Sequence, residues 1–370
     1  MAGKKGKAAD QDLAEIRQRI NEIDSELQAL ISERARFAQK VGIAKGKLGQ
    51  AVDYYRPERE AEILRQVKER NEGPLRDEEM LRLFREIMSA CLAQQEPLKV
   101  GFLGPEGTFT QTAVYKHFGH SVRALPFHTI DEVFREVESG VADFGVVPIE
   151  NSTEGSVNNT LDMFLTSPLK IAGEVELRIE QHLLGRMKGL DAIERICAHE
   201  QSLAQCRGWL REYLPHVELI GMSSNAAGAR RARDEEGTAA IGPDVAADVY
   251  DLNVIVDGIE DRADNSTRFL VVGRELLAPS GRDKTTILVS TSGTARGAGV
   301  LHHLLQPLAD YGVVMTFIES RPSRRKNWDY VFFIDIEGHA QEPPVSDALA
   351  VLEQESSLFR VLGAYPKAVT

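Results

Sequence analysis

The chain has 370 residues, of which 42% are hydrophobic, and its formal net charge at pH 7 is −12. This length and apolar content suffice for two or three domains with separate cores. The acidic balance argues against a broad nucleic-acid or membrane-binding surface, since both need an extended basic face, but it allows an anionic ligand if cationic groups are gathered locally.

The cysteines and the N-terminus predict the compartment. Cys91, Cys197 and Cys206 are an odd number without CxxC spacing, which favours free thiols in a reducing cytoplasm. The N-terminal MAGKKGKAADQ carries lysines but no apolar segment after them, so no signal peptide is expected, and residues 1–11 are predicted to be a disordered basic tail. No apolar run approaches the length of a membrane span. A soluble cytoplasmic protein without nucleic-acid or membrane partners is therefore expected.

Residues 12–96 are predicted to be all helical. Apolar residues from Leu13 to Ala44 recur at steps of three and four, which indicates one long helix with a single apolar face. Pro57 opens a second helix, and Asp77 is placed to cap a third. A helix this long can bury its apolar face only against a partner. Dimerisation is therefore predicted, with a simple coiled-coil arm as the plainer structural interpretation.

Charged residues interrupt the apolar face of the long helix. Arg34 takes the position between Leu30 and Phe37 that should be apolar, and a buried guanidinium needs an anion beside it. Lys45 lies on the same face ~16 Å further along the axis, so the two cations are placed to hold opposite ends of a small dianion. Arg17 is ~25 Å from Arg34 on the same helix and reaches such a ligand only from an antiparallel partner helix.

Polar residues also mark the second and third helices. Arg59 and Glu60 begin the second helix, and Gln95 lies on the apolar face of the third. For Arg17, Arg59 and Glu60 taken singly, a solvated helix face with i,i+4 ion pairs is the more frequent explanation. Arg34 and Gln95 fit that explanation less well because they interrupt apolar faces.

The segment IRQRINEIDSELQALISERARFAQKVGIAK, followed by YRPERE, resembles the all-helical chorismate mutase family. The resemblance implies a cofactor-free site shared by two subunits, in which a Claisen rearrangement needs no nucleophile, only a compact substrate pose and stabilised charge. It implies that the arginines engage the two carboxylates of chorismate, that the lysine and the glutamine bind the ether oxygen, and that the glutamate binds the ring hydroxyl. The residues so assigned are Arg17 of the partner subunit, Arg34, Lys45, Arg59, Glu60 and Gln95.

Residues 97–276 show an α/β pattern. The short apolar runs LKVGFL, FGVVPI, RICAHE and TAAIGP are each followed by a turn and helical spacing, which predicts a domain of two lobes. GPEGTFTQTA, IENSTEGSVNN and SSNAAG place Ser, Thr or Asn where a helix should begin. Helix N-termini bind carboxylates without lysine or arginine, although ordinary capping is the more frequent explanation for each turn alone.

The motifs GPEGTF, PIENSTEGSV and DNSTRFLVV, in this order and spacing, are similar to those of prephenate dehydratases. The resemblance implies a two-lobed domain like that of periplasmic binding proteins, which removes carboxylate and hydroxyl from prephenate to give phenylpyruvate without a cofactor. Thr267 is implied as the catalytic hydroxyl aimed at the departing ring oxygen. The implied or expected substrate-binding residues are Thr108, Asn151, Ser152, His199, Gln205 and Arg268.

The sequence does not identify the proton donor of this reaction. A threonine hydroxyl is a weak acid, so Thr267 is expected to act through hydrogen bonding or a relay. Glu150 and His199 are candidate donors, with a strand-end charge and a satisfied structural histidine as their plainer interpretations. Two other functions also stay open: dehydration of arogenate, and ligand binding without catalysis. The intact Thr267-Arg268-Phe269 sequence argues against the second.

Residues 284–366 are predicted to follow the βαββαβ order of an α+β ferredoxin-like domain. They contain no nucleophile–base pair. The chain has no HExxH or CxxC motif that would place a histidine in a metal-binding context, so no metal is expected. IESRP, DYVFFIDIEGH and LGAYP are similar to the ACT domain, which implies L-phenylalanine bound between two copies and inhibition by population shift. The implied effector contacts are Gly299, Val300, Leu301, Glu319, Ser320 and Arg321.

Together the resemblances cover residues 12–365. They imply a bifunctional chorismate mutase and prephenate dehydratase of phenylalanine biosynthesis, with chorismate and prephenate as substrates and L-phenylalanine as feedback effector. A homodimer or a higher oligomer is expected, because both the long helix and the ACT domain call for a second copy.

Overall fold

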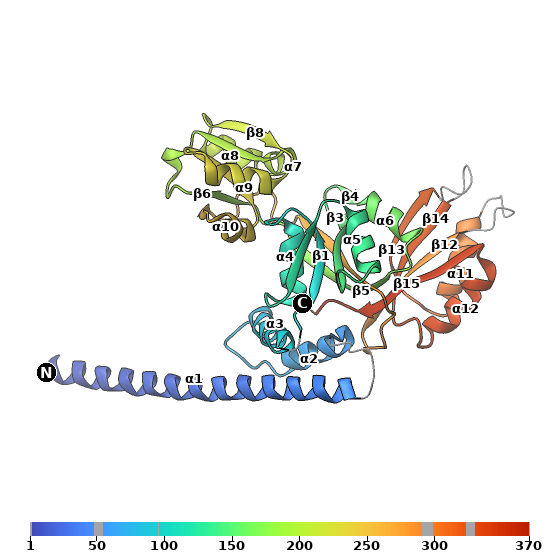
Figure 1. Cartoon of the computed structure of the whole chain (residues 1–370), viewed down its shortest axis with the longest axis horizontal. Helices are drawn as coiled ribbons and strands as arrows, with labels where there is room; N and C mark the ends of the chain where they lie inside the picture. Colours follow the sequence, from blue (N-terminus) through green and yellow to red (C-terminus); the bar gives the residue numbers. More distant parts are fainter. Residues whose placement is uncertain (1, 48–54, 95, 291–298, 323–329, 370) are drawn as a thin grey trace.

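The computed structural model describes residues 2–47, 55–94, 96–290, 299–322 and 330–369. A helical region, an α/β region of two lobes and an α+β region follow one another along the chain, as predicted (Figure 1). Among the described residues, none of the helices combines the length and apolar character that a membrane span requires.

The helical region consists of α1 (Ala2–Lys47), α2 (Pro57–Glu69) and α3 (Asp77–Ala93). Because α1 begins at Ala2, it runs through the segment that was expected to be a disordered tail. The residue that precedes α3 is Arg76, whose backbone N–H donates to the Glu79 carboxylate at 3.1 Å, so Asp77 is the first helical residue rather than the cap.

The apolar face of α1 is exposed in the single chain, and Figure 1 shows α1 extending far beyond α2 and α3. The shorter helices instead share a small core of Leu64, Leu81 and Met88, against which Val369 packs from the C-terminus. The C-terminal end of the chain therefore returns to the helical region after the α+β region is complete.

The first lobe is built on a mixed sheet of order β2-β1-β3-β11-β5, with β4 paired to β3. Strands β1, β2 and β3 are parallel, and β11 is antiparallel to both neighbours. The carboxyl ends of β1 and β3 and the beginning of β11 therefore meet at one edge, where ligands bind in open α/β sheets. The elements are β1 (Lys99–Leu103), α4 (Phe109–Phe118), β2 (Arg123–Phe127), α5 (Ile130–Glu138), β3 (Phe144–Asn151), β4 (Gly155–Ser156), α6 (Asn158–Phe164), β5 (Lys170–Arg178) and β11 (Ser266–Gly273).

The second lobe has a sheet of order β10-β6-β9-β7-β8. Two segments connect the lobes and bond to each other, since the Ile179 N–H donates to Asn265 O at 2.9 Å and the Ile259 N–H to Gln181 O at 2.8 Å. The elements are β6 (His182–Gly185), the 3-10 turn Leu190–Ala192, β7 (Arg195–His199), α7 (Glu200–Gln205), α8 (Arg207–Tyr213), β8 (Glu218–Met222), α9 (Asn225–Asp234), β9 (Thr238–Gly242), α10 (Asp244–Tyr250) and β10 (Asn253–Val256).

The C-terminal region confirms the predicted βαββαβ order, with sheet order β13-β14-β12-β15. Its two helices share one core with the sheet, while Leu288, Phe333 and Leu362 on this sheet join the core of the first lobe. The sheet is therefore covered by its own helices on one side and by the first lobe on the other. The elements are β12 (Asp283–Ser290), α11 (Val300–Asp310), β13 (Met315–Pro322), β14 (Tyr330–Glu337), α12 (Val345–Glu355) and β15 (Leu358–Pro366).

Candidate active sites and regulatory region

In the helical region, Glu60 lies in the first turn of α2 with its side chain 17% exposed. Its Oε1 is 3.9 Å from Nε of Arg85 on α3. Burial raises the pKa of Glu60 to about 7, against the opposing effects of Arg85, a hydrogen bond from Tyr55 and the charge of Arg34 on α1. Three helices thus bring one carboxylate and two guanidiniums together, which is an arrangement that suits a small dianion with a hydroxyl group.

Among the described residues, the structure does not bring the other predicted side chains of this site close to Glu60. Arg59 is 60% exposed and pairs with Glu62 at 2.5 Å. Arg17 is exposed on α1, and the ~25 Å of helix between it and Arg34 keeps the two apart within one chain. The side chain of Lys45 and the whole of Gln95 lie outside the described residues.

Sequence reasoning missed Arg85 and Tyr55. Arg85 is 18% exposed, and its Nε is buried without a hydrogen bond to any described residue. It directly follows Phe84 of the apolar face of α3, so its position in the sequence does not distinguish it from an ordinary exposed arginine. Tyr55 precedes α2 in a segment read as a break between helices, yet it is only 5% exposed.

Tyr55 is buried by the first lobe. Its ring lies 5.3 Å from that of Phe118 and 5.4 Å from that of Phe144, both in the α/β region. Its hydroxyl is 3.3 Å from Nε2 of His117 on α4. Burial, with a smaller effect of Arg85, lowers the pKa of His117 to about 3, so this imidazole is neutral at physiological pH.

In the first lobe, Asn151 at the end of β3 lies opposite Thr267 at the start of β11. Its Oδ1 accepts from the backbone N–H groups of Thr153 and Glu154, at 3.0 and 3.2 Å. These donors fix the amide orientation, so Nδ2 is the atom that donates to Thr267 Oγ1 at 2.8 Å. The threonine oxygen is therefore an acceptor toward Asn151, and its own hydrogen is available in another direction.

Asn265, which sequence reasoning did not single out, organises the same edge. It is 6% exposed, and its Oδ1 accepts from Asn151 Nδ2 at 3.1 Å and from Ser152 Oγ at 3.4 Å. Ser152 Oγ in turn accepts the backbone N–H of Ser266 at 3.0 Å. The available signal was the position of Asn265 in DNSTRF, two residues before Thr267.

Thr108 lies on the same edge of the sheet, in the loop after β1. Its hydroxyl donates to Leu103 O at 3.4 Å and makes no capping bond to α4. The loop touches the second lobe, where the Tyr250 hydroxyl donates to Glu106 O at 2.9 Å. Of the three turns predicted to begin helices with a cap, only that before α9 shows a side-chain cap, in which the Ala227 N–H donates to Ser224 Oγ at 3.0 Å.

The second lobe places the remaining dehydratase candidates around α7. His199 precedes α7, and its Nδ1 accepts from the Gln201 N–H at 3.3 Å. Gln205 accepts at Oε1 from Gln181 Nε2 at 2.9 Å. Gln181 belongs to a connection between the lobes, so the lobe that carries these two candidates is tied to the connecting segment.

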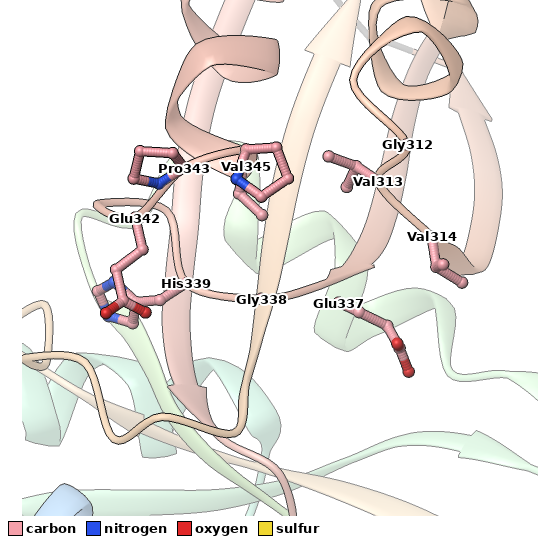
Figure 2. A pocket seen from close by; sticks show the side chains of 10 residues that line it. Gly312, Val313, Val314, Glu337, Gly338, His339, Glu342, Pro343 and Val345 are labelled. Atoms are coloured by element: carbon pink, nitrogen blue, oxygen red, sulfur yellow. The ribbon is translucent and has the colours of Figure 1, made fainter.

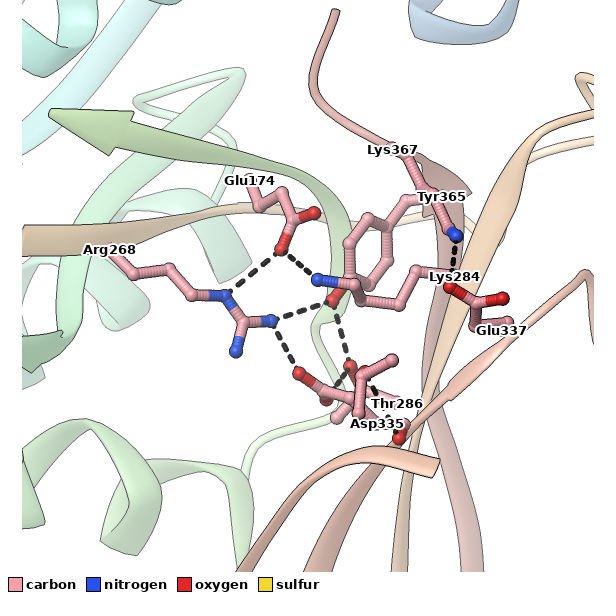
Figure 3. Close-up of polar contacts among 9 residues, drawn as sticks. Glu174, Arg268, Lys284, Thr286, Asp335, Glu337, Tyr365 and Lys367 are labelled. Atoms are coloured by element: carbon pink, nitrogen blue, oxygen red, sulfur yellow. Dashed lines mark hydrogen bonds and ion pairs between the residues drawn. The ribbon is translucent and has the colours of Figure 1, made fainter. Parts of the chain in front are cut away.

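Arg268 is directed away from Thr267. Its Nε donates to Glu174 Oε2 at 3.0 Å and its Nη2 to Asp335 Oδ2 at 2.5 Å and to Tyr365 Oη at 3.3 Å (Figure 3). Burial opposes its charge, but Tyr365, Asp335 and Glu174 together raise the pKa of Arg268 above its ordinary value. Successive strand residues point to opposite faces, so Arg268, expected to bind substrate, serves the junction with the C-terminal sheet and is not among the substrate contacts proposed below.

This junction contains balanced charges. Lys284 Nζ donates to Glu174 Oε2 at 2.6 Å, and Thr286 Oγ1 donates to Asp335 Oδ1 at 2.6 Å. Asp335 is 3% exposed and Glu174 10%. Two carboxylates are thus neutralised by Arg268 and Lys284, which removes most of the cost of burying them.

The predicted effector residues divide into two groups. Gly299, with φ of 92°, precedes α11, and Leu301 and Ser320 are exposed; the side chain of Val300 lies outside the described residues. By contrast, Glu319 accepts from Ser156 Oγ at 3.0 Å. Arg321 bonds to Asn158 Oδ1, and to Asp162 Oδ1 at 2.8 Å. Strands β12 and β13 both finish beside the start of β14. The two groups of predicted effector residues therefore lie at the same end of the sheet.

A cavity of about 280 Å³ lies at the opposite edge of the same sheet (Figure 2). The segments Gly312–Val314 and Glu337–Val345 line it. His339, 1% exposed, borders the cavity and is held by Leu277 O at 3.2 Å from its Nε2 and by the Gln341 N–H at its Nδ1. Within the described residues, no group of three or more His, Cys, Asp or Glu side chains is arranged to hold a metal ion.

Three family models match successive parts of the chain: chorismate mutase type II over residues 16–96, prephenate dehydratase over 100–276 and the ACT domain over 296–354. A bifunctional chorismate mutase/prephenate dehydratase of Pseudomonas aeruginosa is 54% identical over 366 residues, which cover 98% of this chain and 100% of the relative. The chain belongs to the bifunctional chorismate mutase/prephenate dehydratase family. The helical region is its mutase domain, the two lobes are its dehydratase domain and the C-terminal region is its ACT domain.

Two further similarities concern the dehydratase and ACT domains. The crystal structure of a prephenate dehydratase from Arthrobacter aurescens in complex with L-Phe has a TM-score of 0.66 and 37% identity, covering 73% of this chain and 90% of that chain. The chloroplastic arogenate dehydratase 5 of Arabidopsis thaliana is 33% identical, covering 76% of this chain and 71% of the relative.

Proposed function

We propose that the mutase domain converts chorismate to prephenate, that the dehydratase domain converts prephenate to phenylpyruvate, and that L-phenylalanine bound to the ACT domain inhibits the pathway. The family match over the full chain supports both activities. The observation that carries the dehydratase assignment is the hydrogen bond from Asn151 to Thr267, which leaves the threonine hydrogen free at the ligand-binding edge of the sheet.

For the mutase reaction, the cations hold both carboxylates of chorismate while Glu60 accepts a hydrogen bond from the ring hydroxyl. Arg34, Arg59 and Arg17 of the partner subunit supply the guanidiniums, and Lys45 and Gln95 donate to the ether oxygen. The reaction is a rearrangement within one molecule, so the domain contributes pose and electrostatic stabilisation rather than a covalent step. The proximity of Arg34 to Glu60 supports this arrangement.

For the dehydratase reaction, the ring carboxylate leaves as CO₂ and its bonding pair enters the ring as the hydroxyl departs with one proton as water. Thr267 donates a hydrogen bond to the departing oxygen, and Asn151 fixes the threonine. Thr108 and Ser152 from the first lobe, with His199 and Gln205 from the second, surround the substrate. Because a threonine hydroxyl is a weak acid, the proton reaches the leaving group from solvent or from a neighbouring acid through this hydrogen bond.

The proposed assembly is a homodimer in the cytoplasm. Ile16, Ile20 and Leu27 of α1 are 57%, 51% and 50% exposed, and an antiparallel second copy would cover them and bring in Arg17. The three cysteines are free and buried, which suits a reducing compartment. A sedimentation measurement that finds only monomer would contradict the shared mutase site.

A crossed pair of variants tests both catalytic assignments. Arg34→Ala is expected to lower mutase kcat/KM about 100-fold or more and to spare the dehydratase, since one guanidinium that stabilises the transition state is lost. Thr267→Ala is expected to lower phenylpyruvate formation from prephenate by a similar factor and to spare the mutase. Each variant is the folding control for the other. Unchanged phenylpyruvate formation by Thr267→Ala would refute its catalytic role.

The same dehydratase assay distinguishes prephenate from arogenate as the substrate. The likeness to a relative named for arogenate makes arogenate the second candidate. Arogenate carries an amino group where prephenate carries a keto oxygen, so kcat/KM for the two compounds measured side by side decides between them. Faster turnover of arogenate would replace prephenate as the proposed substrate.

A further inference from the structure

Tyr55 connects the mutase carboxylate to a residue of the dehydratase domain. Its hydroxyl lies 3.3 Å from Nε2 of His117 on α4, and Tyr55 is close enough to Glu60 to lower the pKa of that carboxyl. The ring is held between Phe118 and Phe144. The contact is therefore buried at the place where the two domains meet, and its position is set mainly by dehydratase residues.

The donors and acceptors of this chain can be assigned. Glu60, when ionised, accepts only, so the tyrosine hydroxyl donates its hydrogen to the carboxylate. The tyrosine oxygen then needs a donor, and the neutral imidazole of His117 provides it through Nε2–H. Each hydrogen bond polarises the next, so the donation from His117 strengthens the donation from Tyr55 to Glu60.

We propose that Tyr55 and His117 are positioning residues for Glu60, so that the dehydratase domain completes the mutase site of the same chain. The inference deepens the proposed mutase function and rests on the role given there to Glu60. Tyr55 and His117 hold the carboxylate in its ionised form and direct it toward the ring hydroxyl of chorismate. Neither residue touches the substrate.

Several charged groups face this carboxylate, and they set the expected pH dependence. Arg34 from α1 and Arg85 from α3 favour the ionised form, as does the hydrogen bond from Tyr55, whereas burial disfavours it. Glu58 in the same turn of α2 acts on Tyr55 and disfavours ionisation of the tyrosine. Removal of the tyrosine hydroxyl therefore raises the pKa of Glu60, and mutase activity falls at a higher pH than in the wild type.

The test is the pH profile of mutase kcat/KM in the full-length chain. Tyr55→Phe keeps the ring between the phenylalanines and removes only the hydroxyl. We expect the acid limb of the profile to move upward by about 1 to 2 pH units, the size expected for one hydrogen bond to a charged group. At high pH the variant should approach wild-type activity, and dehydratase kcat/KM with prephenate should stay within about twofold.

A pair of substitutions at His117 tests the second link. His117→Leu removes the donor and is expected to move the acid limb in the same direction by a smaller amount. His117→Gln keeps an N–H donor and is expected to return the limb toward the wild-type position. The matched control is Tyr115→Phe, also on the dehydratase domain, whose hydroxyl accepts from Gln111 at 3.0 Å and should leave the profile unchanged.

Two outcomes overturn the inference in distinguishable ways. If Tyr55→Phe lowers the melting temperature but leaves the acid limb in place, while Glu60→Gln removes that limb, Tyr55 is only a packing residue and the role of Glu60 stands. If Glu60→Gln retains the wild-type profile, Glu60 is not the titrating group, and its proposed role and the positioning roles fall together.

Discussion

The dehydratase domain contacts its two neighbours through junctions of opposite character. Toward the mutase domain the buried contact is neutral, between the Tyr55 hydroxyl and the imidazole of His117, and a hydrogen bond between Glu86 and His120 lies at the exposed margin. Toward the ACT domain the buried contact is ionic, with Arg268 and Lys284 neutralising Glu174 and Asp335. The first junction therefore joins neutral side chains, and the second holds two sheets together through buried ions.

The difference follows from what each contact must hold. Buried ions tolerate little displacement, because a separated pair leaves uncompensated charges in a dry environment. Two further hydrogen bonds hold the first lobe against the ACT sheet: Lys170 Nζ donates to Val361 O at 2.7 Å, and Arg360 Nη2 donates to Ser167 O at 2.6 Å. The ACT sheet is thereby tied to β11, the strand that carries Thr267. We therefore expect a change in the ACT domain to be transmitted to the proposed dehydratase site through β11.

Breaking the ionic junction should have the largest effect. Arg268→Ala leaves Asp335 and Glu174 short of a cation and should lower the free energy of unfolding by about 3–5 kcal/mol, as for other buried pairs. We also expect it to weaken inhibition of the dehydratase by L-phenylalanine, because β11 is released from the ACT sheet. Urea unfolding and an inhibition curve measure the two effects.

The matched control is Arg135→Ala, on α5 of the same lobe. Arg135 is 65% exposed and pairs with Glu136 at 3.3 Å, so its loss should cost less than about 1 kcal/mol. The double variant Arg268→Ala/Asp335→Ala should cost less than the sum of its parts, since it leaves one charge fewer unpaired. Strict additivity would mean that Arg268 and Asp335 are not coupled.

Two glycines, one at each junction, show how closely the neighbouring domains pack there. A Cβ at Gly363 on β15 would lie 2.3 Å from Ile171 O, a backbone atom of β5 that cannot move alone. A Cβ at Gly119, with φ of +73°, would lie 2.6 Å from Ser89 Cβ on α3. Gly363→Ala should cost about 3 kcal/mol and Gly119→Ala about 1–3 kcal/mol, the range for overpacking. Thermal unfolding with both activity assays measures each.

The two glycine variants should also differ in function. Gly363→Ala is expected to weaken the response to L-phenylalanine, and Gly119→Ala to lower mutase activity through the displaced α3. Gly189→Ala is the control, since its Cβ would meet no atom within 4 Å. A Gly119→Ala variant that loses the phenylalanine response and keeps the mutase would reverse the assignment of the junctions.

The smallest effect is expected at the exposed margin of the mutase junction. His120 Nδ1 lies 2.7 Å from Glu86 Oε1, and the His120 side chain is 69% exposed. Glu86→Ala should therefore change the free energy of unfolding by less than about 1 kcal/mol and leave both activities within twofold. A loss of several kcal/mol in urea unfolding would show that this margin is structurally essential.

The order of the three regions could be predicted from the sequence because periodicity and motif order are local properties. The run GVVPIEN before a turn predicted a strand that ends in site residues, and the structure places Asn151 there. The same alternation rule predicted nothing about which face of β11 meets the substrate. Arg268 was therefore expected beside Thr267 in the site, although the strand turns it to the ACT domain.

The missed residues depend on contacts between distant segments. Tyr55 is separated by 62 positions from His117, and Arg268 by 67 from Asp335, so no local pattern relates the partners. Arg34 could be proposed from the sequence because a charge within an apolar repeat is visible locally. Arg85 was missed because it lies one position beside such a repeat, where exposure is the usual outcome.

The orientation of β11 has an evolutionary consequence. Neighbouring codons, 267 and 268, specify side chains on opposite sides of one strand, and we propose that the first acts in catalysis and the second in regulation. Selection for a less restrained enzyme can therefore act on the side that faces Glu174 and Asp335 while the adjacent codon stays fixed. Strains that overproduce aromatic amino acids should accumulate their changes along that side.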